Sequence, residues 1–245
     1  MTVSRTAQSV AALRATFDRP STPGGDPDAQ RRLARGMTPG RALELRDQLL
    51  ERTTFFDRVV LDALARGVDQ VVIVGAGYDD RALRFRSPGV RFFELDHPST
   101  QADKRKRLEG TDGGPAFAPV DLVRESVAGA LAAAGHSDAR PTLFICEGVL
   151  VYLEPPDIVR MLAELASRAG DGSELAVSLA IHAPEYPTEA VLRVVNEARG
   201  DHAGEPWRTI LPRDAHLDLL RRAGWVEQEV LGEERSLLVR VTVAE

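Results

Sequence analysis

The chain has 245 residues, of which 43% are hydrophobic and 28% are charged, a composition typical of one soluble α/β domain with a short extension. Its net charge of −6 disfavours nucleic acid or an anionic membrane as a partner. The single cysteine, Cys146, excludes an internal disulfide and suits a reducing compartment. Because we find neither a membrane-spanning apolar run nor a signal-peptide core, we expect a cytoplasmic protein.

Helices precede the first strand. Apolar residues at helical spacing predict helices over residues 6–17, 28–34 and 42–65. The first two are separated by a segment rich in proline and glycine, residues 20–27, which is the best linker candidate. We expect residues 1–68 to form a helical lid over a ligand crevice, and residues 69–245 to form the ligand-binding domain.

A strand and a glycine turn follow. Residues 71–74 are four consecutive apolar residues, as in a parallel strand buried on both faces. Gly75 and Gly77 then remove two side chains, so a ligand can approach the backbone before a helix starts near Ala82. The dinucleotide fingerprint has a third glycine where this chain has Asp80, which counts against NAD or FAD.

An acidic residue ends the second predicted strand. Asp96 follows Gly75 at about the spacing, some 20 residues, at which an acid binds the two hydroxyls of a ribose. The alternative is that Asp96 caps a helix that begins near Pro98. The glycine turn at the matching distance favours ribose binding.

Strands and helices then alternate to the C-terminus. Strands are expected at 91–95, 117–120, 142–146 and 174–180, and helices at 125–134, 155–169, within 184–204 and at 214–223. A last pair of strands, 225–231 and 236–243, requires one strand to run antiparallel. The fold class is therefore α/β, with a seven-stranded, mostly parallel, Rossmann-like sheet. Its antiparallel last strand is expected at an edge, the layout of class I S-adenosylmethionine-dependent methyltransferases.

Four loops should meet at the carboxyl edge of this sheet, where open α/β sheets bind ligands. They carry the glycine turn, then Asp96, then Asp121 with Leu122, then Glu147. Glu147 ends an apolar strand, and an unpaired carboxylate there would be costly. We therefore expect a functional role for it.

Several motifs resemble the leucine carboxyl methyltransferase family. They are Arg52-Thr53 and the segments at 75–81, 94–98 and 147–153, while the opening segments at 4–7, 13–15 and 26–29 are similar to its bacterial branch of O-methyltransferases. The resemblance covers most of the chain to about residue 155. The C-terminal third matches only in general layout.

The resemblance implies S-adenosylmethionine as cofactor and assigns roles around it. Arg52 would bind the methionine carboxylate, Asp96 the ribose, and Glu147 would face the amino or sulfonium group. The remaining cofactor-binding positions are the glycine turn Gly75, Ala76 and Gly77, and the adenine neighbours Asp121 and Leu122. From the residues alone, Arg52 could be a solvated helix arginine, and Asp121 could cap the next helix with Ser126 as a rival.

The expected reaction is methyl transfer to a carboxylate or hydroxyl of a small molecule, such as a polyketide. A hydroxyl acceptor needs a base, for which His182 is the best-placed histidine, although a single histidine after a strand is more often a loop residue. Tyr152 could touch the acceptor or simply pack. The segment between the fifth strand and the last helix is shorter than in the family's eukaryotic phosphatase methyltransferases, which disfavours a protein acceptor. No metal is expected, because no metal-ligand spacing occurs.

Other basic residues are expected at the surface. Arg81 and Arg84 fit exposed first-turn arginines better than an acceptor clamp, and residues 104–107 fit a solvated helix face. Two rival functions remain: an NAD(P)-dependent oxidoreductase, and a methyltransferase-like binding module without activity. The oligomeric state is open.

Overall fold

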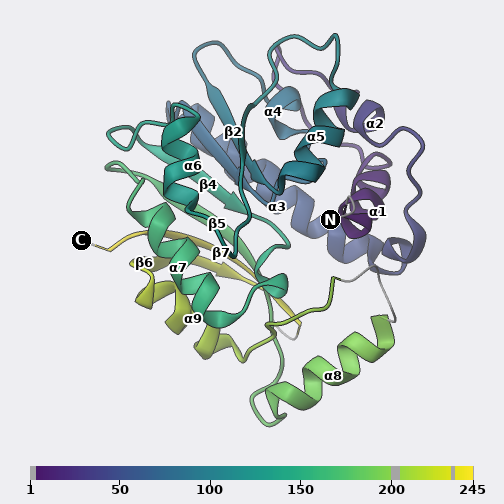
Figure 1. Cartoon of the computed structure of the whole chain (residues 1–245), viewed down its shortest axis with the longest axis vertical. Coiled ribbons are helices and arrows are strands. Elements are labelled where there is room, and N and C mark those ends of the chain that lie inside the picture. Colours follow the sequence, from purple (N-terminus) through teal and green to yellow (C-terminus); the bar gives the residue numbers. More distant parts are fainter. Residues whose placement is uncertain (1–3, 200–204, 233–234, 245) are drawn as a thin grey trace.

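A computed structural model describes residues 4–199, 205–232 and 235–244, and it contains a seven-stranded sheet in the order β3-β2-β1-β4-β5-β7-β6 (Figure 1). β7 is antiparallel to both of its neighbours, and the other pairs are parallel. The expected reversed strand is thus present, but it lies one place inside the edge because β6 pairs beyond it. The strands are β1 (Gln70–Val74), β2 (Arg91–Asp96), β3 (Ala116–Pro119), β4 (Thr142–Cys146), β5 (Glu174–Ala180), β6 (Trp225–Leu231) and β7 (Ser236–Val243).

The helices follow the predicted order with shifted ends. The helix expected after the glycine turn is only the four-residue α4, and the 125–134 helix begins later because Ser126 caps it at the Gly129 amide. Residues 200–204 of the segment expected to hold a helix lie outside the described residues. The helices are α1 (Arg5–Arg14), α2 (Ala29–Leu33), η1 (Gly40–Leu45), α3 (Arg46–Ala65), α4 (Arg81–Arg84), α5 (Pro98–Arg107), α6 (Val127–Ala133), η2 (Leu150–Tyr152), α7 (Pro155–Ala166), α8 (Thr188–Arg199) and α9 (Arg213–Arg222).

The core lies on both faces of the sheet. Val72 and Val74 of β1 face a cluster shared with α6, α7 and α9, whereas Val71 and Ile73 face a cluster shared with α3 and α4 (Figure 1). Burial on both faces explains why the strand is a continuous apolar run. α3, which was grouped with the expected lid, is therefore a core helix of the sheet.

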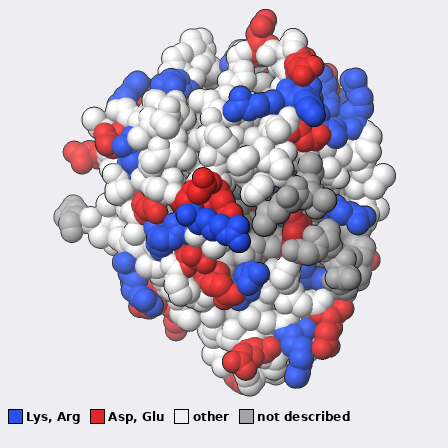
Figure 2. All heavy atoms as spheres, in the orientation of Figure 1, with Lys and Arg blue, Asp and Glu red and all other residues white. Residues whose placement is uncertain are grey.

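The N-terminal helices reach the turn after β1. Ala11 of α1 and Ala34 pack on Tyr78, and Gln30 Nε2 donates to the Tyr78 carbonyl at 3.0 Å. α8, in contrast, contains no buried residue and stands away from the body of the molecule (Figure 1). In the described part of the chain, no helix combines the length and apolar character needed to cross a membrane. On the face shown in Figure 2, basic and acidic side chains are interspersed.

Candidate functional site

The sheet order brings the four expected loops together. β3, β2, β1 and β4 are neighbours and parallel, so the residues after their carboxyl ends line one edge. These residues are Asp121, Asp96, Gly75 and Glu147. Open α/β sheets bind ligands at this edge.

The glycine turn has a backbone that favours glycine. Gly75 and Gly77 have φ values of +60° and +48°, a region that other residues rarely adopt. A Cβ on Gly75 would lie 2.4 Å from Val149 Cγ2, and one on Gly77 would lie 3.1 Å from Ala7 Cβ. The turn thus runs between the loop after β4 and helix α1.

Asp96, the last residue of β2, forms a hydrogen bond with the backbone of the glycine turn. Its Oδ2 accepts the Gly77 N–H at 2.5 Å, and its Oδ1 accepts the His97 N–H at 2.6 Å. Burial raises the pKa of Asp96, which these N–H donors oppose. Each carboxylate oxygen keeps a lone pair that could accept a ligand hydroxyl. The next helix is capped by His97, not by Asp96.

Glu147 is surrounded by arginines. Its Oε1 accepts from Arg14 Nη2 at 2.7 Å and from Arg52 Nε at 3.0 Å, and its Oε2 accepts from Arg81 Nη1 at 2.8 Å. Burial would raise the pKa of Glu147, but the three guanidinium groups hold it well below its usual value. These ion pairs compensate the burial of a carboxylate at the end of an apolar strand.

These contacts belong to a larger arginine–carboxylate cluster. Arg81 also pairs with Asp57 at 2.7 Å and with Asp79 at 2.5 Å, while Arg84 pairs with Asp80 at 2.7 Å. The expectation that Arg81 and Arg84 are exposed was wrong, since they are 0% and 4% exposed. The whole cluster comprises Arg14, Arg19, Arg52, Arg81, Arg84, Asp57, Asp79, Asp80 and Glu147.

Arg52 is the member that can take an additional partner. Five arginines against four carboxylates leave one positive charge in excess. Arg52 has the most exposed side chain of the cluster, at 27%, and no hydrogen bond occupies its terminal nitrogens within the described ranges. Those nitrogens lie about 3.5 Å from where a Cβ on Gly148 would be. A ligand carboxylate would balance the charge and fill the free donors.

Asp121 and Leu122 follow β3, next to the strand of Asp96. Asp121 Oδ1 accepts the Val123 N–H at 3.0 Å, and the Leu122 carbonyl accepts from Arg160 Nη2 at 2.7 Å. Asp121 is therefore a turn residue, and the alternative in which it caps α6 was wrong because Ser126 does so. Both residues are partly exposed.

The two candidate catalytic residues differ in their bonding. His182 is 8% exposed, and its Nδ1 lies 2.8 Å from the Ala183 carbonyl and its Nε2 3.0 Å from Thr188 Oγ1. Both ring nitrogens are thus engaged at the start of α8. Tyr152 is half-buried, and its hydroxyl makes no hydrogen bond with the described residues.

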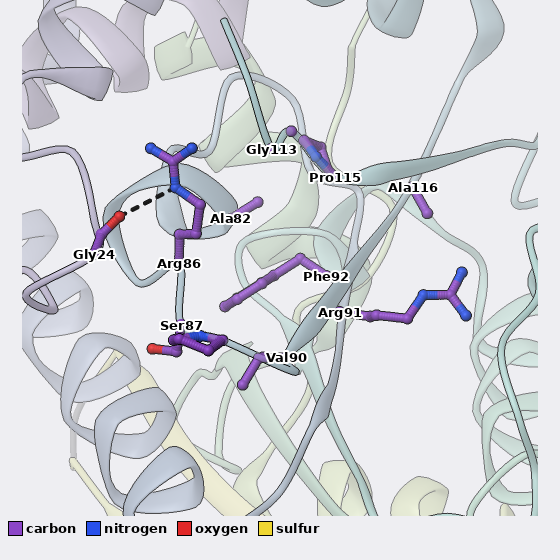
Figure 3. Close-up of a pocket in the computed structure, with 12 residues that line it drawn as sticks. Gly24, Ala82, Arg86, Ser87, Val90, Arg91, Phe92, Gly113, Pro115 and Ala116 are labelled. Atoms are coloured by element: carbon purple, nitrogen blue, oxygen red, sulfur yellow. Dashed lines mark hydrogen bonds between the residues drawn. The ribbon is translucent and has the colours of Figure 1, made fainter.

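A cavity of about 630 Å³ lies away from this edge (Figure 3). Phe92 and Ala116 line it near the amino ends of β2 and β3, and Arg86 and Gly113 come from neighbouring loops. Arg86 donates to the Gly24 carbonyl at 3.1 Å. Because the glycine turn lies at the carboxyl ends, this cavity is separate from the candidate site. No cluster of potential metal ligands occurs in the part of the chain that the structure describes.

The pairing within this cluster was not predicted from the sequence. Arg14 was noted only within a family-like segment, and Asp57 and Asp79 were not singled out. Asp79 and Arg81 are two positions apart beside the glycine turn, and an alternating acid and base there was an available signal. Arg14 gave no comparable signal, because its partner Glu147 lies 133 positions away.

The amino-acid sequence matches a known family model. The family is leucine carboxyl methyltransferase, and the match spans residues 11–166. A protein of Frankia alni named "Putative S-adenosyl-L-methionine-dependent methyltransferase" is 35% identical over 190 residues, covering 76% of this chain and 64% of the relative. A protein of Mycolicibacterium gilvum with the same kind of name is 35% identical over 210 residues, covering 82% of this chain and 67% of the relative. The chain thus spans about two thirds of their length.

Solved structures share the fold. A "putative methyltransferase" from Thermobifida fusca matches with a TM-score of 0.61 at 18% identity, covering 98% of this chain and 94% of that one. The magnesium protoporphyrin IX methyltransferase of Synechocystis, with bound S-adenosylhomocysteine, matches with a TM-score of 0.56 at 19% identity, covering 89% and 94%. These likenesses establish a Rossmann-like class I fold.

Proposed function

Because this chain belongs to the leucine carboxyl methyltransferase family, we propose that it transfers a methyl group from S-adenosylmethionine to the carboxylate of a small molecule. The observation that carries the proposal is the partly exposed Arg52, which has free donors beside Glu147 and Gly148. A small-molecule hydroxyl is the alternative acceptor.

The residues at the carboxyl edge fit the cofactor. Arg52 would bind its methionine carboxylate, which would also balance the excess charge of the cluster. Gly75, Ala76 and Gly77 would pass beneath the methionine portion, because the turn lies at the carboxyl end of β1, where open α/β sheets bind ligands. The bound cofactor would supply an electrophilic methyl group on its sulfonium.

The other end of the cofactor would lie along β2 and β3. Asp96 would accept the ribose hydroxyls with its remaining lone pairs, and Asp121 with Leu122 would border the adenine. Glu147 would keep one acceptor position on Oε2 for the amino group, because Oε1 already accepts two hydrogen bonds.

The bonding of His182 supports a carboxylate acceptor. A carboxylate is ionised at neutral pH and needs no base, whereas an alcohol or phenol does. Both nitrogens of His182 are engaged by Ala183 and Thr188, so this side chain is poorly placed to receive a proton. Tyr152 would serve as a contact for the acceptor. The step then depends on aligning the carboxylate oxygen with the methyl carbon.

We further propose that the first 68 residues include the lid. α1 and the linker would cover the cofactor, because Ala7 contacts the turn and Arg14 reaches Glu147. α3 would serve as the fixed support behind them. Residues 69–245 would form the cofactor-binding unit.

The test is methyl transfer from S-adenosylmethionine with a radioactive methyl group to matched sets of small carboxylic acids, phenols and short peptides. A methyl ester releases labelled methanol in mild alkali, whereas a methyl ether does not. We expect alkali-labile product from a carboxylic acid, and none with Asp96→Ala. Alkali-stable product from a phenol alone would establish the alternative acceptor and refute the carboxylate.

A further inference from the structure

Lys104 is a buried cation beneath the glycine turn. It begins the basic run at the end of α5 that was expected to be solvated throughout, yet its side chain is only 1% exposed. The next two residues, Arg105 and Lys106, are exposed as expected. A buried ammonium group is costly unless partners compensate its lost hydration. The groups that contact Lys104 therefore indicate which role its buried charge has.

One partner is the backbone at the exit of the turn. Lys104 Nζ donates to the Asp79 carbonyl at 2.7 Å. Helix α4 does not use this carbonyl, because its first backbone bonds, from Leu83 and Arg84, go to the carbonyl of Asp80. Without Lys104 the buried Asp79 carbonyl would lose this donor.

The second partner is Glu94 of β2, whose Oε2 lies 2.7 Å from Lys104 Nζ. This contact is an ion pair outside hydrogen-bond geometry, and Glu94 Oε1 has no hydrogen-bond partner among the described residues. The ionisable groups that act on Glu94 are Lys104, Asp79 and Asp96. Burial raises the pKa of Glu94 to about 7, and Lys104 opposes that rise.

Asp79 joins Lys104 to the arginine–carboxylate cluster. Its carbonyl accepts from Lys104, while its carboxylate accepts from Arg14 and Arg81. The backbone between these contacts leads back to Gly77, whose N–H is held by Asp96. The backbone after the turn is thus held by two sets of contacts, those of the Asp79 carboxylate with arginines and that of the Asp79 carbonyl with Lys104.

We propose that Lys104 is a positioning residue that sets the backbone of residues 75–80 for the cofactor. This inference rests on the proposed function for its effect on cofactor binding. The effect of Lys104 on the backbone of residues 75–80 is expected even in the protein without a bound cofactor.

The test compares Glu94→Gln with the double variant Lys104→Met/Glu94→Gln. The two differ only at Lys104, and neither leaves an uncompensated carboxylate. Lys106→Met is the matched control on the same helix. The readouts are calorimetric affinity for S-adenosylhomocysteine and hydrogen exchange of the backbone amides of residues 75–80 in the free protein. Lys104→Gln in the Glu94→Gln background is a second variant should the methionine variant fail to fold.

We expect Glu94→Gln and Lys106→Met to bind within about threefold of the unmodified chain, and the double variant to bind about tenfold more weakly than Glu94→Gln. In the double variant, the backbone amides of residues 75–80 should exchange about tenfold faster than in Glu94→Gln, whereas exchange in β4 and β5 should be the same in the two proteins. Equal affinity and equal exchange in the two Glu94→Gln proteins would overturn the inference. If the unmodified chain binds no S-adenosylhomocysteine, the proposed function fails, while the exchange comparison still decides the role of Lys104.

Discussion

Arg14 Nη2 lies 2.7 Å from Glu147 Oε1, and this contact joins the first helix to the loop after β4. Both side chains are 6% exposed. Because the two side chains are buried and 133 positions apart in the sequence, this ion pair connects the position of the N-terminal helix to the charge of Glu147.

Replacing Arg14 by Met tests this connection. The substitution removes buried charged hydrogen bonds to Glu147 and Asp79, which keep their other arginine partners, so the free energy of unfolding should fall by about 2 kcal/mol. Urea unfolding at neutral pH measures it. Arg5→Met, an exposed change on the same helix, should leave the unfolding free energy nearly unchanged. An equal effect of the two substitutions would mean that the Arg14 contact does not stabilise the folded chain.

Gly75→Ala should disrupt the turn. The added Cβ would lie 2.4 Å from Val149 Cγ2, at a φ of +60°. We expect affinity for S-adenosylhomocysteine to fall by about tenfold or more, and Val149→Ala in the same chain to recover part of it. Gly172→Ala is the control, because its φ is +79° and no atom lies within 4 Å of the added Cβ. If Gly75→Ala and Gly172→Ala lost comparable affinity for S-adenosylhomocysteine, the effect would be due to general backbone strain and not to the contact with Val149.

The raised pKa of Glu94 predicts a pH-dependent stability. Burial raises this pKa from 4.5 to about 7 in the folded chain. Between these values the folded state binds the proton more tightly than the unfolded state, so the Glu94 contribution to stability falls as pH rises. The stability of Glu94→Gln relative to the unmodified chain should therefore rise as the pH rises from about 4.5 to 7, by on the order of 1–3 kcal/mol in total.

Glu147→Gln provides the control of opposite sign. Arginines lower the pKa of Glu147 in the folded chain, so its stabilising contribution is present above pH 4.5 and is lost as pH falls. The stability that the Glu147→Gln variant loses relative to the unmodified chain should be largest at neutral pH and should diminish in acid. Parallel pH profiles for the Glu94 and Glu147 variants would contradict both assignments.

His182→Gln should retain methyl transfer. Loss of a general base typically lowers the rate 10²–10⁴-fold, whereas loss of the contacts with Ala183 and Thr188 should affect the start of α8. We expect turnover within about tenfold of the unmodified chain, measured with the acceptor that the labelled-methyl screen identifies. A thousandfold loss that is greatest for a hydroxyl acceptor would restore His182 as the base.

Much of the fold was predictable because strands and turns are encoded locally. β4 and β5 match the expected bounds, since each is an apolar run bounded by turn residues. α4 has only four residues, and its Arg81 and Arg84 side chains pair with buried carboxylates, which the local pattern did not indicate. The position of β7 inside the sheet depends on long-range pairing with β5, which local patterns do not specify.

The part of the candidate site that could be predicted is the glycine turn, because its backbone conformation favours one residue type. Gly75 and Gly77 have positive φ values, which local sequence can signal. The partners of Glu147 could not be predicted, because Arg14, Arg52 and Arg81 lie 133, 95 and 66 positions away in the sequence. Burial of Lys104 inside a basic run was equally hidden, since its neighbours are solvated.

We propose above that the carboxyl edge of the sheet binds S-adenosylmethionine through Asp96 and the glycine turn. Calorimetric titration with S-adenosylhomocysteine, repeated on Asp96→Ala and with NADH as the control ligand, tests this binding most directly. We expect micromolar binding of S-adenosylhomocysteine, its loss in the variant, and no heat from NADH. Binding of NADH without binding of S-adenosylhomocysteine would refute the proposed cofactor and favour an oxidoreductase.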